Sequence, residues 1–304
     1  MAATTPGPNA VPSARPSAMS SAARPAPRRG PGRSLRTAGF HTGAILLSAV
    51  WFLPIALILI ISLRSTDDVL GHGLNALPHS FHPGNYASAW TGGGMEHALV
   101  NSAVIAVPSV ALTLLLASMA AFALSRYEIP LRRTLILVML GGNLLPPQIL
   151  LVPVAKLSQV FGVYDTLTTL IVVEVGFGLG FYVFVLQGFM RSIPAEIQQA
   201  ALIDGAGPFQ IYWRIVLPLT RPALAALGAL AFTWIFNDLL WPITVLITES
   251  KMPVTPALLT LQGQFVSYWN VIAAGSVIAA VPTVAVFLRF QRHFISGLNL
   301  GAVK

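Results

Sequence analysis

The sequence contains no cysteine and few charged residues. The absence of cysteine excludes disulfide frameworks, iron–sulfur clusters, zinc sites built on thiolates and cysteine nucleophiles. Asp, Glu, Lys and Arg make up 9% of the 304 residues, whereas soluble domains carry about 25% because their whole surface faces water. Hydrophobic residues make up 55%. This composition excludes a soluble globular enzyme and an intrinsically disordered chain, and it indicates a membrane protein.

Common catalytic signatures are also absent. None of the three lysines follows a glycine, so the chain has no phosphate-binding loop for ATP hydrolysis, and it has no GxSxG or HExxH motif. Four of the six histidines fall in the first predicted external loop, namely His72, His79, His82 and His97. A metal site is one interpretation of this group. Because their spacing matches no known metal motif, we expect solvated loop histidines instead.

Residues 1–41 differ in composition from the rest. They hold seven of the 23 prolines, six arginines and no acidic residue, which predicts a disordered cytoplasmic tail. The apolar run 44–63 follows. It is too long for the hydrophobic region of a signal peptide and long enough to cross a bilayer of about 30 Å, so we expect an uncleaved first span.

The remainder, 42–304, is predicted to be one membrane domain of six transmembrane helices and no strands. The five further apolar runs cover 98–124, 134–157, 166–190, 222–247 and 269–287. If the chain crosses six times, 15 of the 18 basic residues fall on one side. The positive-inside rule then predicts that both termini are cytoplasmic. The net charge of +8 therefore reports orientation and attraction to anionic lipid, and it does not argue for nucleic acid.

Prolines interrupt five of the six predicted spans. Pro54 is interpreted as a tolerated kink against neighbouring helices. The pair Pro146 and Pro147 is interpreted as a functional bend, because the polar residues Asn143 and Gln148 flank it inside the span. We expect that bent helix to line a cavity.

Two carboxyl groups, of Glu174 and Asp238, lie inside predicted spans. A charge near the bilayer centre costs about 2.5 kcal/mol or more, so both should face protein or water. Asp238 follows Asn237 between Trp234 and Trp241, on a helical face that could stack a polar ring, which suits carbohydrate or another polar solute. A structural pair between Asp238 and a partner helix is an equally good interpretation. The glycines at 176, 178 and 180 follow Glu174 and predict close helix packing through small residues.

The predicted cytoplasmic loop 191–221 gives the strongest signal. Ser192 can cap a helix, Pro194 suits its first turn, and Gly205 can end it in a left-handed conformation. The pattern predicts a short helix over 194–204, a turn, and a second short helix up to Leu217.

One face of the first predicted helix suits protein docking. Its members are Ile197, Ala200, Ala201 and Asp204, and the two alanines would let a partner approach the backbone closely. An amphipathic helix lying on the membrane is the alternative. It is less favoured, because the face lacks flanking basic residues and a bulky apolar stripe.

This loop resembles the EAA motif of importers driven by an ATP-binding cassette. The matching residues are Gln199, Ala200 and Ala201, then Gly205, then 215–218. The chain is most similar to permeases of the maltose-type carbohydrate importers. Further segments that carry this resemblance are 85–86, 147–153, 203–206, 234–242 and 291–304.

The resemblance implies a non-catalytic membrane subunit of the bacterial cytoplasmic membrane that imports a carbohydrate by alternating access. Its implied partners are a second permease subunit, two ATPase subunits that bind ATP and Mg²⁺, and an external solute-binding protein. The implied coupling residues are Glu196, Gln199, Ala200, Ala201, Asp204 and Gly205. Gln199 replaces the usual Glu of the motif, so Glu196 is expected to share its role. A self-contained secondary transporter that uses Glu174 or Asp238 as a proton site is the alternative.

Overall fold

The computed structural model describes residues 31–261 and 268–300, and within these ranges every regular element is helical. The chain divides into two compact units, Met1–Leu53 and Pro54–Lys304. The first described element is α1, Pro31–Ser62, in which Gly39–Ser62 is long and apolar enough to cross a membrane. It begins earlier than the expected end of the tail at residue 41, and proline suits a first helical turn. The rest of the predicted tail, 1–30, lies outside the described residues.

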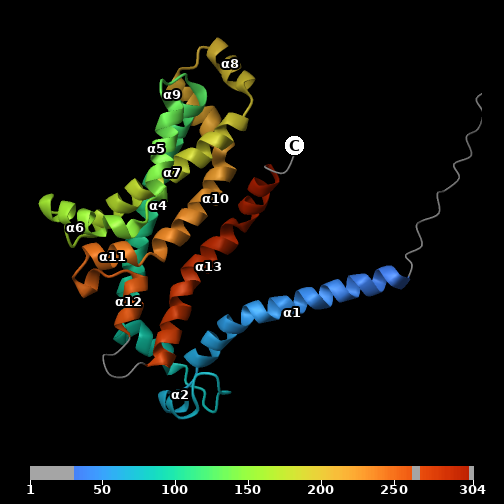
Figure 1. The fold of residues 1–304 in the computed structure, drawn as a ribbon, viewed down its shortest axis with the longest axis vertical. Helices are drawn as coiled ribbons and strands as arrows, with labels where there is room; N and C mark the ends of the chain where they lie inside the picture. Colours follow the sequence, from blue (N-terminus) through green and yellow to red (C-terminus); the bar gives the residue numbers. More distant parts are fainter. Residues whose placement is uncertain (1–30, 262–267, 301–304) are drawn as a thin grey trace, which may run out of the picture. The chain divides into compact units, whose positions relative to one another are not determined.

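Four long helices form the body of the second unit (Figure 1). They are α4 Met95–Arg126, α7 Leu167–Ser192, α10 Leu217–Phe236 and α13 Trp269–Leu300. Helix α4 runs along α7, and α10 packs against both α4 and α13. Ala117 and Ala121 of α4 are fully buried, so small side chains let these helices approach closely.

The predicted close packing of the glycine run is correct at one glycine. A Cβ on Gly180 would lie 2.3 Å from the carbonyl oxygen of Met139 on α5 (Arg132–Leu144), so only glycine fits there. A Cβ on Gly176 would meet nothing within 4 Å. Gly180 is therefore required by helix packing, whereas Gly176 is not.

The third predicted span is sharply bent. Helix α5 ends at Leu144, and the following η2 (Pro147–Leu150) and α6 (Leu151–Val160) continue at 89° to it. Leu145 and Pro146 are extended, because a residue before proline is disfavoured in the helical region. The described residues thus contain five candidate spans, and a sixth if the bent pair crosses as one.

The predicted break at Leu217 is absent. Short α9 (Pro208–Ile211) and the π-helical η3 (Tyr212–Val216) continue directly into α10, and Pro208–Phe236 reads as one apolar helix. Pro218 has no N–H to donate to the preceding turn. The wider π turn just before it accommodates that missing bond, so the helix continues past the proline.

The fifth span ends earlier than predicted. Helix α10 stops at Phe236, and α11 (Leu240–Val245) begins only after a three-residue break. Beyond it lie η4 (Glu249–Lys251) and α12 (Val254–Thr260), which packs against α4 and α13. The predicted span 222–247 is therefore a long helix followed by a short one.

A buried polar network holds the first loop after α1, which carries α2 (Thr66–His72), α3 (Gly84–Ala87) and η1 (Ser88–Gly92). The side-chain amide of Asn85 donates to the carbonyl oxygens of Ser62 and Arg64 at 2.9 and 2.8 Å. Asn270 of α13 donates in turn to Asn85 Oδ1 at 2.9 Å. This network therefore joins the loop to the last helix of the bundle.

Candidate functional site

The predicted cytoplasmic helix is α8, Ala195–Ile203. It lies at the end of the second unit opposite α2 and α12 (Figure 1). Ser192 does not cap it, which corrects the prediction: α7 continues through Ser192, and the serine hydroxyl donates to the Phe189 carbonyl at 2.7 Å. Pro194 occupies the N-cap position instead, with no side-chain hydrogen bond.

The end of α8 is a Schellman turn built on Gly205. Gly205 has φ +80°, as predicted. Its N–H donates to the Leu202 carbonyl at 3.0 Å, and the N–H of Ala206 donates to the Ala201 carbonyl at 2.9 Å. This bond pair satisfies carbonyls that the helix end leaves without partners. The turn directs the chain from α8 straight into α9.

The surface of α8 differs from the predicted docking face. Ala201 is only 7% exposed and belongs to the buried apolar cluster that also contains Ile211 and Tyr212. It therefore belongs to the core and is not available to a partner. The remaining predicted coupling residues, Glu196, Gln199, Ala200, Asp204 and Gly205, are all exposed, as is Ile197.

Three exposed apolar residues beside them were not singled out from the sequence. Leu202, Ile203 and Phe209 are 50%, 86% and 68% exposed. Their signal is present in the sequence, since bulky apolar residues flank a helix end that carries charged neighbours. An apolar patch of this kind, rimmed by polar residues, is typical of a protein-binding surface.

Helix α4 is hydrogen-bonded to the chain segments just before and after α8. Arg126, the last residue of α4, donates through Nη2 to the carbonyls of Met190 and Ile193 at 2.8 and 3.0 Å. On the other side, Ser118 of α4 shares a 2.7 Å hydrogen bond with the hydroxyl of Tyr212 in η3. Displacement of α8 would therefore act on α4 as well as on α10. Arg126 was counted in the sequence only as an orientation signal.

The predicted pathway residues are not brought to a single site. Asn143 and Gly176 line a cavity of about 360 Å³ between α5 and α7. Asn143 donates to the Met139 carbonyl at 3.2 Å. Gln148 is exposed on η2 and does not line this cavity. Glu174 is half-buried on α7.

Asp238 acts locally at the break in the fifth span. Its carboxylate accepts the backbone N–H groups of Leu240 at 3.3 Å and Trp241 at 3.0 Å, which are the first residues of α11. The residue is half-buried. Asp238 therefore supports the start of α11 within its own chain, and its predicted pair with a partner helix stays a prediction.

The predicted tryptophan face around Asp238 is wrong. Trp241 is 4% exposed and its ring lies 4.9 Å from that of Phe177 on α7. Trp234 is 56% exposed and contacts Phe181 at 5.6 Å between ring centres. Because the helix breaks between them, the two tryptophans do not share a face. Asn237 donates to the Thr233 carbonyl at 2.7 Å and to Thr283 of α13 at 3.4 Å.

An ion pair closes the turn before α7. Lys251 Nζ lies 2.9 Å from Asp165 Oδ2, and Asp165 Oδ1 accepts the backbone N–H groups of Ile247 and Thr248. The Thr248 hydroxyl also donates to Asp165. These hydrogen bonds hold the pKa of Asp165 well below its ordinary value, and the bond from the Thr248 hydroxyl contributes most. The contacts tie the α6–α7 turn to the segment that follows α11.

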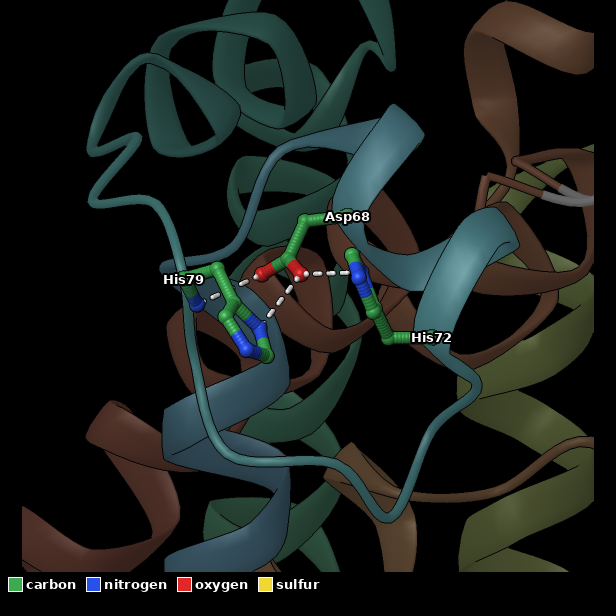
Figure 2. Close-up of side chains that lie close together, drawn as sticks. All are labelled: Asp68, His72 and His79. Atoms are coloured by element: carbon green, nitrogen blue, oxygen red, sulfur yellow. Dashed lines mark hydrogen bonds and ion pairs between the residues drawn. The ribbon is translucent and has the colours of Figure 1, made fainter.

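Two of the four loop histidines come together. His72 and His79 both lie against Asp68, whereas His97 lies beside Glu96, 3.3 Å from its carboxylate. Figure 2 shows both rings turned toward the Asp68 carboxylate. These three residues form a group that could hold a metal ion, which the spacing did not predict.

Known proteins resemble the chain along most of its length. It is 33% identical over 267 residues to the diacetylchitobiose uptake system permease protein NgcG of Streptomyces coelicolor, covering 87% of this chain and 88% of that protein. It is 33% identical to the trehalose transport system permease protein SugB of Mycobacterium tuberculosis, covering 83% and 92%. It is also 30% identical to the melibiose/raffinose/stachyose import permease protein MelC of Bacillus subtilis, covering 86% and 94%.

A solved structure shares the fold. A chain of a bacterial ABC transporter involved in alginate import superposes with a TM-score of 0.73 at 24% identity, covering 86% of this chain and 98% of that one. Residues 98–299 match the family described as binding-protein-dependent transport system inner membrane component. The long apolar helices agree with these similarities, and the chain is a member of this family of multi-pass membrane permeases.

Proposed function

We propose that this chain is a membrane subunit of an ATP-binding-cassette importer that takes up a carbohydrate across the bacterial cytoplasmic membrane. The observation that carries the proposal is the extended similarity to permeases named for diacetylchitobiose, trehalose and melibiose/raffinose/stachyose. These names share one chemistry, that of sugars with two or more rings. Membership of the binding-protein-dependent family adds an external solute-binding protein as a partner.

Helix α8 is proposed as the coupling helix. Its exposed Leu202 and Ile203, together with Phe209 of α9, would enter a groove of a partner ATPase. Burial of an apolar side chain contributes about 1.5–3 kcal/mol when complete. Ala200 would allow close approach, while Glu196 and Gln199 offer polar contacts on the exposed surface. Glu196 supplies a negative charge three residues before the neutral Gln199.

The link from α8 to the membrane is proposed to be mechanical. The Schellman turn at Gly205 leads into one helix that runs from Pro208 to Phe236 without a loop. A rigid helix transmits a push along its axis to the break at 237–239. Closure of two ATPases would then rock the helices between outward-facing and inward-facing arrangements.

The assembly is proposed to contain a second permease subunit, two ATPases that bind ATP and Mg²⁺, and the solute-binding protein. A similar solved structure is a bacterial alginate ABC transporter in complex with a substrate-bound periplasmic protein. Both termini of this chain would be cytoplasmic, on the side of α8. The distribution of 15 of 18 basic residues supports that orientation.

The cavity between α5 and α7 is the proposed region of the solute pathway in this subunit. Asn143 supplies an amide that can hydrogen-bond sugar hydroxyls, and Gly176 leaves space beside it. Asp238 is less suited to a mobile proton site, because backbone N–H groups of α11 already occupy its carboxylate.

The direct test is uptake by the reconstituted complex. The chain, its partner permease, the ATPases and the binding protein encoded beside it are placed in liposomes with labelled trehalose, melibiose or a chitobiose derivative outside. We expect uptake of a sugar with internal ATP and none with an ATPase variant that cannot hydrolyse it. Uptake that persists on a proton gradient alone would overturn the proposal in favour of a secondary transporter.

A further inference from the structure

The loop after α1 is organised by a buried arginine. The Arg64 side chain is fully buried, and its Nε lies 2.9 Å from Asp68 Oδ2. Its Nη2 donates to the Asp68 carbonyl at 3.0 Å, and its Nη1 donates to the carbonyls of Gly73 and Leu74 at 2.9 and 3.2 Å. Asp68 is 4% exposed. Arg64 therefore fixes the Asp68 carboxylate in place without a bound ligand.

The second carboxylate oxygen of Asp68 faces two imidazoles. Oδ1 lies 3.1 Å from His72 Nδ1 and 3.3 Å from His79 Nδ1 (Figure 2). The backbone N–H of His79 donates to Oδ2 at 3.1 Å, which anchors the loop that carries this ring. The rings are stacked, with centres 4.4 Å apart and planes 23° apart. Three ligand-type atoms thus converge within 4.8 Å of one another.

These separations suit a tetrahedral metal ion. Bonds of about 2.0–2.2 Å to nitrogen and oxygen place neighbouring ligand atoms of a tetrahedral zinc ion about 3.3–3.6 Å apart. The observed 3.1 and 3.3 Å from Asp68 Oδ1 are close to these values, and the third separation, between the two imidazole nitrogens, is within 4.8 Å. Because the two rings are stacked, they would turn out of parallel to direct both nitrogens at one ion. The two histidine side chains are 54% and 59% exposed, so an ion can enter from solvent and keep a water ligand.

We propose that Asp68, His72 and His79 form a binding site for a divalent transition-metal ion of the zinc type. Two imidazoles and one carboxylate are a ligand set that such ions use when a fourth position holds water. Arg64 is the supporting group, because a hydrogen-bonded second oxygen orients the ligating carboxylate. The neighbouring positive charge of Arg64 also weakens the site, so we expect reversible binding.

The ion would cross-link the loop. His72 ends α2, and His79 belongs to the irregular segment that follows it. One ion bound to both closes that segment onto α2, next to the Asn85 and Asn270 network. The proposal does not depend on which solute the importer carries.

The test uses the intact importer complex after removal of metals with a chelator. Zinc is titrated against a chromophoric chelator, and Co²⁺ is added separately to record the visible absorption of a tetrahedral site. We expect one zinc ion per copy of this chain to be lost in His72→Ala and in His79→Ala. The matched controls His82→Ala and His97→Ala, from the same predicted external segment, should keep it.

A second measurement needs no variant. Zinc should protect His72 and His79 of the wild-type complex from modification by diethyl pyrocarbonate, while His82 and His97 remain reactive, as read by mass spectrometry. Equal zinc binding by all four variants, or equal modification of all four histidines with and without zinc, would overturn the proposal.

Discussion

The two ends of the second unit use their polar and apolar side chains in opposite ways. The loop end buries Arg64, Asn85 and Asn270 in a hydrogen-bonded network. The α8 end exposes the apolar side chains of Leu202 and Ile203. A buried polar network fixes one arrangement, because each member loses a partner when it moves. An exposed apolar patch instead gains stability when a partner covers it.

The largest expected effect is at the loop end. Asn85→Ala removes the donor for two carbonyls and the acceptor for Asn270, and each buried group left without a partner costs about 1–3 kcal/mol. We expect a lower thermal midpoint of the purified complex by fluorescence-detected gel filtration. Gln148→Ala, which removes an exposed amide, is the control and should change little. A stable Asn85→Ala complex would show that the network does not hold the loop.

At the other end, Gly205→Val should impair coupling. Valine at φ +80° costs roughly 1–2 kcal/mol or more, since its Cβ clashes in the left-handed region. We expect ATP-driven uptake to fall about tenfold, with normal membrane insertion. Gly207→Val is the matched control, because φ at Gly207 is −74° and nothing lies within 4 Å of its Cβ position. Equal loss of uptake in both variants would refute a specific role for the turn.

Ile203→Ser tests the apolar patch and should have a smaller effect. Removing one apolar side chain from an interface costs about 1 kcal/mol if it is partly buried there. We expect weaker association with the ATPase subunits on pull-down at limiting concentration and an unchanged thermal midpoint. Leu77→Ser is the control at the loop end, where the side chain is 79% exposed and Ile203 is 86% exposed. Loss of association in both variants would contradict a localised docking surface.

The smallest effect concerns acid sensitivity of the α6–α7 turn. Because the fold lowers the pKa of Asp165, its contribution is fully present above the unfolded pKa of about 3.9 and is lost as pH falls through the lower folded value. Between pH 5 and 8 stability should not depend on this group. Asp165→Asn should flatten the decline of the thermal midpoint below about pH 4, and an unchanged decline would show that other carboxylates dominate.

Some of the structure follows from local sequence. Gly205 is a helix stop because glycine adopts a left-handed conformation without strain, and it has φ +80° as predicted. The pair Pro146 and Pro147 predicted a bend, which is confirmed at 89°. The inward position of Ala201 was not predicted, because a short alanine-containing helix has no strong apolar periodicity to orient it.

The break after Phe236 shows where local signals fail. No glycine or proline marks residues 237–239, and only the polar pair Asn237 and Asp238 separates the apolar runs of α10 and α11. Packing of Trp241 against Phe177 and the cap from Asp238 stabilise the change of direction. Both interactions require α7 or the broken backbone itself, so a sequence pattern could not reveal them.

The sequence by itself determined that this chain is a helical membrane protein of the binding-protein-dependent permease family with a capped helix between two spans. Low charge, long apolar runs and a glycine turn are properties of short segments, and they have their structural effect without tertiary contacts. Only the tertiary structure decided which side chains meet. Ala201 is buried and Asp238 bonds the start of α11 because of how neighbouring helices pack. His72 and His79 meet at the Asp68 carboxylate because the buried Arg64 holds that carboxylate in place.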